Sequence, residues 1–398
     1  MEKEILIPVI LLTSFLALAG VQWWEPKVAA SATMEHTQEA PKIDPTLIRF
    51  LSDYEAYLNQ AMEESGVPGL AVAVVKDSNV IFKKGFGVKE ANTRDSVDEH
   101  TVFRLASLSK GFAPVLTGIL AEERCLQWED KVVSYVPDFR LSSRRNTKEL
   151  NLQHVLSHTT GLPRHAYSNL IDRGGDYATA RRKLRKVKIA HPVGAYYNYQ
   201  NVAFSLIADV IEKACGRNYV DLMQEKVYTP LGMTNASTTY EAIMENENVA
   251  LPHRHYGHGF KKVDISPNYY VIPPAAGVNA SINDMAQWLQ LLMGNRPDVI
   301  SQETLDQIFT PYVDLFKTDR TLRRWRPVDH AYYAMGWRVL EKAGRRIIYH
   351  GGYVNNYRAE IAFDPDEKIG VVVLCNAPVG FMSEVLPTFF EMYNREVS

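Results

Sequence analysis

The residues best suited to chemistry are the serine and the lysine of Ser107-Leu108-Ser109-Lys110. Apolar residues recur at helical spacing from Leu108 to Leu120, so this tetrapeptide opens a predicted helix. Because residues three apart share a helix face, Lys110 reaches back towards the Ser107 hydroxyl, where an amine can activate the nucleophile. The N–H groups and positive dipole of the helix start suit a developing oxyanion. A capping serine beside a solvated lysine would leave the same motif, and we expect Ser109 to cap or pack.

A phenol and an imidazole stand in two further motifs. The triplet His350-Gly351-Gly352 ends a predicted strand, and Tyr-x-Asn triplets precede it. Taken in order, Ser-x-x-Lys, Tyr-x-Asn and His-x-Gly resemble the motifs of the serine β-lactamase-like superfamily, in its branch of class C β-lactamases, D-alanyl-D-alanine carboxypeptidases and esterases. The resemblance covers roughly residues 47–395. Tyr-x-Asn itself begins at Tyr57, Tyr167, Tyr196, Tyr199 and Tyr353.

The flanking residues select one Tyr-x-Asn motif by this resemblance. Tyr199-Gln200-Asn201 follows His191-Pro192-Val193-Gly194 and precedes an apolar helix, which looks like the family's Pro-Pro-Gly, Tyr-Ser-Asn and helix pattern. Tyr167-Ser168-Asn169 is the alternative. The stretch from Leu156 to Pro163 resembles a structural hallmark of the family, so we interpret His158 within it as structural.

The resemblance implies a role for each matching residue. Ser107 would attack a carbonyl carbon and form an acyl-enzyme. Lys110 and Tyr199 would share the proton transfers, either of them as the base, with Tyr199 passing a proton to the leaving group. Asn201 would hydrogen-bond Lys110 and the acyl amide of the substrate. The backbone N–H groups of Ser107 and Tyr353 would hold the oxyanion.

The third motif departs from the family's lactamases, which usually carry Lys-Thr-Gly. His350 resembles the carboxypeptidase and peptidase members, and it would orient the leaving side with a charge that titrates near about pH 6–7. Gly351 lacks the hydroxyl that many relatives use to hold a substrate carboxylate, which argues against efficient β-lactam hydrolysis. We expect Gly351, Gly352 and Tyr353 to line the substrate site. Two glycines that bend a strand beside a surface histidine are the structural alternative.

Strand patterns lie at both ends of the chain and helix patterns lie between them. We predict an α/β (α+β) fold with a largely antiparallel sheet built from N- and C-terminal strands, flanked by helices, with an inserted helix-rich domain. Predicted strands cover 70–75, 80–82, 332–341, 346–350, 357–363 and 369–375. Predicted helices include 47–62, 203–214, 219–227, 283–293 and 382–394. The hydrolase domain is placed at 46–398, with 46–120 and 300–398 as the α/β lobe and 121–299 as the helical lobe.

The apolar run from Ile5 to Val21, followed by Trp23 and Trp24, predicts export. Such a run suits both a cleaved signal peptide and an uncleaved membrane anchor, and the sequence does not distinguish between these two assignments for residues 1–24. Residues 25–45 are polar and aperiodic and are a predicted linker. We expect a periplasmic protein, or one anchored in the membrane through residues 5–24 and facing away from the cytoplasm.

Composition excludes several other classes. Lys and Arg total 44 against 46 for Asp and Glu, a balance that argues against a nucleic-acid binder. Three cysteines form no CxxC pair, so we predict small buried hydrophobes rather than zinc ligands or disulfides. The histidines at 253, 255 and 258 lack a carboxylate-rich partner and are assigned to a surface loop, so we predict no metal and no cofactor. The basic runs at 181–188 and 317–326 are interpreted as solvated faces, and attraction to anionic lipid headgroups or an acidic wall polymer is the alternative.

We therefore predict a serine hydrolase that acts on a peptide, amide or ester bond of a small-molecule or peptide substrate. His350 favours D-alanyl carboxypeptidase-like or D-peptidase activity. A β-lactamase or carboxylesterase with the same site is the alternative within this class. A non-catalytic binding or self-assembling protein of the same fold is the alternative from another class, and a homo-oligomer stays open.

Overall fold

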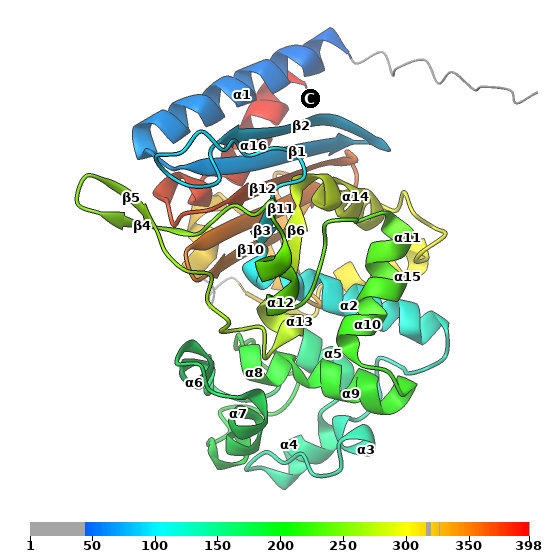
Figure 1. Ribbon diagram of the computed structural model, residues 1–398. Helices are drawn as coiled ribbons and strands as arrows, with labels where there is room; N and C mark the ends of the chain where they lie inside the picture. Colours follow the sequence, from blue (N-terminus) through cyan, green and yellow to red (C-terminus); the bar gives the residue numbers. More distant parts are fainter. Residues whose placement is uncertain (1–43, 316–319, 326, 398) are drawn as a thin grey trace, which may run out of the picture. The chain divides into compact units, whose positions relative to one another are not determined.

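The computed structural model describes residues 44–315, 320–325 and 327–397, and Ile43–Ser398 forms one compact unit (Figure 1). The predicted signal or anchor at 1–24, and the predicted linker up to residue 43, lie outside the described residues. Within the described ranges, no helix is long and apolar enough to cross a membrane.

Eight strands of the described chain form one antiparallel sheet, in the order β2-β1-β12-β11-β10-β9-β8-β7. Figure 1 labels the part of this sheet from β2 to β10. The N-terminal strands join the C-terminal ones where β1 pairs with β12, with Val72 opposite Val373. The predicted fold class, with an antiparallel sheet built from both ends of the chain, is confirmed. The strands are β1 Gly69–Lys76, β2 Asn79–Gly87, β7 Val313–Asp314, β8 His330–Tyr333, β9 Arg338–Lys342, β10 Arg345–Val354, β11 Tyr357–Asp364 and β12 Ile369–Cys375.

Both faces of the central strands are buried, which explains their unbroken apolar runs. On β12, Val371 and Val373 belong to the core shared with α1 (Pro45–Ser65) and α16 (Val385–Glu396). Val372 and Leu374 belong to the core on the opposite face, shared with α2 (Ser109–Glu122) and α14 (Ile282–Leu292). Alternate side chains point to opposite faces of a strand, so a strand covered on both sides needs apolar residues throughout.

The predicted helices between the two groups of strands form, and two of them are divided into shorter elements. The segment 203–214 is split into α8 (Asn201–Phe204) and α9 (Leu206–Cys215), and 219–227 is α10 (Tyr219–Met223) followed by a π-helical turn. The other helices are α3 Val132–Tyr135, α4 Arg144–Glu149, α5 Leu152–Leu156, α6 Ser168–Asp172, α7 Tyr177–Lys183, α11 Thr229–Leu231, α12 Tyr240–Glu245, α13 Pro273–Ala276 and α15 Gln302–Phe309.

Two strand predictions need correction. The strand predicted over 332–341 is two strands, β8 and β9, because Gly336 adopts a left-handed φ of +77° and turns the chain. The predicted loop around the histidines is a hairpin of β4 (His253–Tyr256) and β5 (Gly259–Lys262), and His253 is buried there. A further short pair, β3 (Val102–Arg104) with β6 (Asn279–Ser281), was not predicted.

The prediction for the cysteines was wrong for two of the three. Cys125 and Cys215 form a disulfide, and their Cα atoms lie 5.8 Å apart although 90 residues separate them in the chain. Cys375 is a buried free thiol, as predicted. The disulfide links Cys125, three residues beyond the C-terminal end of α2, to the last residue of α9.

Candidate active site

Ser107 lies in a tight 3-10 turn, Ala106–Leu108, that leads directly into α2. Ala106 has a φ of +51°, a conformation that residues other than glycine rarely adopt and that recurs at functional sites. The buried Ser109 hydroxyl stabilises the turn, since it donates to the Ala106 carbonyl (2.7 Å) and accepts from the Val278 N–H (3.0 Å). Of the two roles expected for Ser109, capping or packing, the structure shows packing, because α2 has no side-chain cap hydrogen bond and Ser109 is buried in its first turn.

Lys110 lies fully buried in the first turn of α2, with Nζ 3.4 Å from Ser107 Oγ. Its amine donates to Asn201 Oδ1 (2.9 Å) and to the Ala275 carbonyl (2.8 Å). Burial holds the pKa of Lys110 well below its usual range, and the positive charge of Arg338 lowers it further. Both effects disfavour the charged form, and the neutral amine is the form that can accept a proton.

Tyr199 belongs to the loop before α8, and its hydroxyl donates to Ser107 Oγ over 2.8 Å. The neighbouring His158 positions this loop, because its Nδ1 accepts from the Gln200 N–H (3.2 Å) and its ring lies 4.4 Å from the Tyr199 ring. Burial, followed by the charge of Lys110, lowers the pKa of His158 well below its usual range, which keeps Nδ1 an acceptor. Tyr167, the alternative tyrosine, lies instead at the N-terminal end of α6.

His350 is fully buried on β10, so it is not a surface histidine as the structural alternative required. Its Nε2 lies 3.3 Å from the Tyr333 hydroxyl, and its Nδ1 lies 3.0 Å from the Gly351 carbonyl oxygen. The ring also packs edge-on against Trp337, with centroids 6.4 Å apart.

The two glycines of β10 face opposite sides of the strand. A Cβ at Gly352 would lie 2.7 Å from the Leu105 carbonyl oxygen and 2.9 Å from the Ser107 nitrogen, so only glycine lets the strand pass this close to the nucleophile turn. This approach places Tyr353, the next residue, beside that turn. A Cβ at Gly351 would instead lie 2.4 Å from Glu360 Oε2, on the other side.

Sequence reasoning missed three contributors to this site. The Ala275 carbonyl, on α13, accepts a hydrogen bond from Lys110, and Arg338, on β9, acts on the Lys110 pKa. Tyr269 has a strained φ of +74°. Burial raises the pKa of its hydroxyl, and the hydrogen bond to Asp172 and the nearby Tyr199 raise it further. Positive φ at a bulky residue marks strain but leaves no sequence signal, and a lone arginine in a strand leaves none either.

An antiparallel sheet whose strand β10 passes beside a serine, a lysine and a tyrosine in hydrogen-bond contact defines a protein of the β-lactamase and penicillin-binding protein superfamily of serine hydrolases. The sequence matches the Beta-lactamase family over residues 54–388, and the chain belongs to that family.

Known relatives agree with this assignment at low identity. The chain is 28% identical over 346 residues to an unguisins hydrolase of Aspergillus campestris, covering 81% of this chain and 61% of that protein. It is 22% identical over 349 residues to protein flp of Staphylococcus aureus, covering 86% of this chain and 66% of flp. The chain thus spans less than two thirds of either relative.

A solved structure shares the fold. The octameric penicillin-binding protein homologue from Pyrococcus abyssi superimposes with a TM-score of 0.72 at 25% identity, covering 87% of this chain and 76% of that one.

Proposed function

We propose that the protein hydrolyses a peptide, amide or ester bond through an acyl-enzyme on Ser107, with D-alanyl carboxypeptidase-like or D-peptidase activity favoured. The observation that carries this proposal is the position of Ser107 Oγ, 2.8 Å from the Tyr199 hydroxyl and 3.4 Å from Lys110 Nζ. Proton transfer needs about 2.6–3.2 Å between heavy atoms, and such distances are often longer in a site without substrate. One relative carries the name of a hydrolase.

Lys110 is the general base in this proposal. The neutral amine has two N–H bonds, and the Asn201 amide oxygen and the Ala275 carbonyl accept both of them. In the charged form the third N–H donates to Ser107 Oγ over 3.4 Å, and in the neutral amine this third position holds the lone pair. Ser107 Oγ itself accepts the Tyr199 O–H. The Ser107 proton therefore moves to Lys110 as Oγ attacks the carbonyl carbon.

Tyr199 is the acid that releases the leaving group. As the C–N or C–O bond breaks, its hydroxyl proton passes to the leaving atom, and the proton held by Lys110 restores the phenol. The backbone N–H groups of Ser107 and Tyr353 bind the oxyanion. Water then attacks the acyl-enzyme by the reverse proton path and frees Ser107.

Two features favour a peptidase over a β-lactamase. His350 occupies the position where the family's lactamases usually carry lysine, and Gly351 offers no hydroxyl to a substrate carboxylate. The volume that such a hydroxyl would need is held by Glu360, 2.4 Å from the Cβ position.

The test is intact-protein mass spectrometry after exposure to a fluorophosphonate, penicillin, p-nitrophenyl esters and D-Ala-D-Ala peptides. We expect one covalent adduct on the wild type and none on Ser107→Ala. Ser78→Ala, a change in an exposed turn, is the matched control and should label normally. Turnover separates the alternatives: nitrocefin indicates a β-lactamase, simple esters alone indicate a carboxylesterase, and no adduct or turnover indicates a binding or self-assembling protein.

Tyr199→Phe and Tyr167→Phe form a second matched pair, because both tyrosines begin a Tyr-x-Asn motif. We expect slow acylation in Tyr199→Phe, by about 10²–10⁴-fold, and wild-type acylation in Tyr167→Phe. The reverse result would move the site to the other motif.

We also propose export to an oxidising compartment. The Cys125–Cys215 disulfide supports this, since disulfides persist mainly outside the cytoplasm. Differential alkylation of protein taken from the native cell fractions tests it, and a fully reduced pair in a cytoplasmic fraction would contradict it.

A homo-oligomer is a further proposal, supported by the octameric state printed for the Pyrococcus abyssi homologue. Light scattering during size-exclusion chromatography tests it, and a monomer at all accessible concentrations would exclude it.

A further inference from the structure

Cations gather on the helical lobe around the basic run at 181–188, which the proposed acyl transfer does not use. Residues 138–191 contain twelve lysines and arginines against four aspartates and glutamates, whereas the whole chain contains 44 against 46. The rest of the chain is therefore acidic, with 32 lysines and arginines against 42 aspartates and glutamates. Charge segregated in this way gives one part of the surface a positive potential that attracts anions.

An apolar backing fixes the direction in which the basic run faces. Leu184 is fully buried, and Val187 and Ile189 pack against the same core. Lys186 and Lys188 alternate with these residues in the chain and are exposed. The cations point outwards because the apolar residues between them point inwards.

Helix α4 extends this surface. The Ser142 hydroxyl, just before α4, donates to the Val187 carbonyl (2.6 Å), and Asn146 Nδ2 donates to the His191 carbonyl (2.9 Å). Figure 1 shows α4 and α7 at the lower end of the molecule, opposite α1. Six exposed cations of these two segments form what we call the basic face, namely Arg144, Lys148, Arg182, Arg185, Lys186 and Lys188.

The basic face has no carboxylate of its own. Among the residues that the structure describes, none of its six cations forms an ion pair, and the carboxylates nearby have other partners. Asp138 and Asp209 both bind Arg181, at 2.9 and 3.2 Å. Asp176 caps α7 by accepting a hydrogen bond from the Thr179 N–H (2.7 Å). The positive charge of the face is therefore left for a partner outside this part of the protein.

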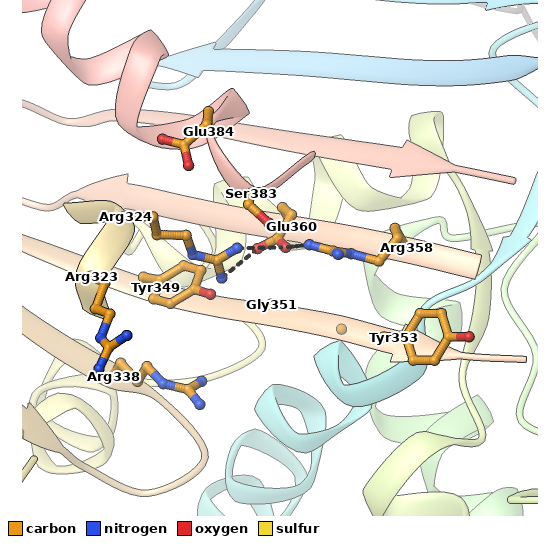
Figure 2. Close-up of a pocket in the computed structure, with 11 residues that line it drawn as sticks. Arg323, Arg324, Arg338, Tyr349, Gly351, Tyr353, Arg358, Glu360, Ser383 and Glu384 are labelled. Atoms are coloured by element: carbon orange, nitrogen blue, oxygen red, sulfur yellow. Dashed lines mark hydrogen bonds and ion pairs between the residues drawn. The ribbon is translucent and has the colours of Figure 1, made fainter. Parts of the chain in front are cut away.

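A second group of arginines, in the pocket beside Gly351, has a different setting. Figure 2 shows Glu360 between Arg324 and Arg358, and its carboxylate accepts hydrogen bonds from both, over 3.2 and 2.8 Å. That carboxylate compensates positive charge from within the protein. The comparison singles out the basic face as the surface whose charge lacks an internal counterpart.

Exposed aromatic rings adjoin the basic face. Tyr196 is 40% exposed and stacks on the His191 ring, with centroids 4.4 Å apart. Tyr312 is 37% exposed, and its hydroxyl lies 3.9 Å from the Cβ position of Gly194, in the same loop as Tyr196. Tyrosine favours the headgroup region of a bilayer, where the ring meets apolar chains while the hydroxyl stays in water. An acidic polymer in water offers no apolar layer, so these rings favour a lipid surface.

We propose that the basic face, with Tyr196 and Tyr312 at its margin, binds the surface of a bilayer that contains anionic lipids. Each exposed lysine or arginine gains free energy close to the negatively charged headgroups. The tyrosine rings add contacts at the boundary between headgroups and acyl chains. This interaction is separate from the acyl transfer and does not depend on it.

A fluorescent probe on the face tests the proposal in the full-length chain. Ala190 is exposed between Lys188 and His191, and Ser78 is exposed in the turn between β1 and β2. Ala190→Cys and Ser78→Cys each add one reactive thiol, because Cys375 is buried and the other two cysteines form a disulfide. Each variant carries an environment-sensitive dye on that thiol. The vesicles are phosphatidylcholine alone, or equal parts of phosphatidylcholine and phosphatidylglycerol.

We expect the dye at Ala190→Cys to shift its emission to the blue on the vesicles with phosphatidylglycerol and not on phosphatidylcholine alone. The shift should weaken as salt rises, because salt screens exposed charges. The dye at Ser78→Cys should not respond to phosphatidylglycerol. Any contribution of residues 1–42 is common to both labelled chains, so the difference between them reports the basic face.

Charge variants of the labelled Ala190→Cys chain identify the binding groups. They are compared at a salt concentration where half of the parent's emission is shifted. Lys186→Gln and Lys188→Gln should each lower the ratio of shifted to unshifted emission by about fivefold. Arg254→Gln with Lys261→Gln is the matched control, since it removes two exposed cations that lie opposite each other on β4 and β5. This control should leave the ratio unchanged, and melting temperatures should show that every variant folds.

Three outcomes overturn the proposal. The first is an emission shift at Ala190→Cys that is absent, or equal on the two kinds of vesicle. The second is an equal loss in the Lys186→Gln and Lys188→Gln variants and in the control. The third is retention on heparin that Lys186→Gln and Lys188→Gln weaken, without a response to phosphatidylglycerol, which would assign the face to an acidic polymer. Labelling of Ser107 is measured separately, so the proposed function stands or falls on its own test.

Discussion

At the scale of single residues, the base role proposed for Lys110 depends on how burial shifts its pKa. Only its neutral form accepts the Ser107 proton, and burial shifts its pKa downwards, so acylation should rise with pH through this lowered pKa and be lost below it. Lys110→Met and Lys110→Arg should both lower kcat/KM by about 10²–10⁴-fold. Stopped-flow acylation across pH measures this. A near-active arginine variant would show that positive charge, not proton acceptance, is what Ser107 needs.

The same residue opposes folding at neutral pH. Unfolded Lys110 regains its ordinary pKa and binds a proton that the buried amine resists, so this residue makes stability rise with pH until both states are neutral. Lys110→Met removes that dependence. We expect Lys110→Met to raise the free energy of unfolding above that of the wild type by more at pH 7 than at pH 10. Urea unfolding at both pH values checks this, and a relative stability independent of pH would contradict it.

Gly351 is required by its neighbours rather than by backbone conformation. A Cβ there would lie 2.4 Å from Glu360 Oε2 and 2.6 Å from the Tyr349 hydroxyl, and both partners are buried. Gly351→Ala should therefore lower the unfolding free energy by about 1–3 kcal/mol. Gly259→Ala, on β5 with no atom within 4 Å of its Cβ position, is the control and should change it by less than about 0.5 kcal/mol. Denaturant titration compares the two.

At the scale of elements, the disulfide links the two helical segments that carry the candidate site. α2 begins beside Ser107 and ends near Cys125, and the helices after Asn201 end at Cys215. Cys125→Ser with Cys215→Ser should cost about 2–4 kcal/mol of stability, because the unfolded chain regains the freedom of a 90-residue loop. Reductant should destabilise the wild type equally and leave the double variant unchanged. A wild type insensitive to reductant would contradict the link.

Local sequence patterns predicted most helices and strands. They could not predict contacts between elements that are distant in the chain. Apolar runs identified β1, β10, β11 and β12, because both faces of these strands are buried. The turn at Gly336 divides a run that reads as one strand. The disulfide joins cysteines with no shared local motif, so spacing alone suggested unpaired thiols.

The residues of the candidate site also differ in whether local sequence could predict them. Ser107 and Lys110 share one helical turn, so their spacing alone predicts that they meet. Tyr199 needed its flanking residues, since five Tyr-x-Asn triplets look alike locally. Arg338 comes near the site through the register of β9 with β10, where it lies opposite Tyr349, and register is a property of the folded sheet.

At the scale of the whole molecule, the compact unit Ile43–Ser398 should fold and react without residues 1–42. Its first helix is complete within that unit, because Asp44 caps α1 by accepting a hydrogen bond from the Thr46 N–H (2.8 Å). Phe50 of α1 packs edge-on against Phe389 and Tyr393 of α16, with ring centroids 5.2 and 5.5 Å apart. A chain that begins at residue 43 should keep the wild-type melting temperature and Ser107 labelling.

The matched control is a chain that begins at residue 66 and lacks α1. It exposes the buried aromatic face of α16 and one face of the sheet, so we expect it to be insoluble or to lose cooperative unfolding. Calorimetry and fluorophosphonate labelling compare the two truncations. If the chain from residue 43 failed as the shorter one does, residues 1–42 would be part of the folding unit, and the boundary at 42/43 would be wrong.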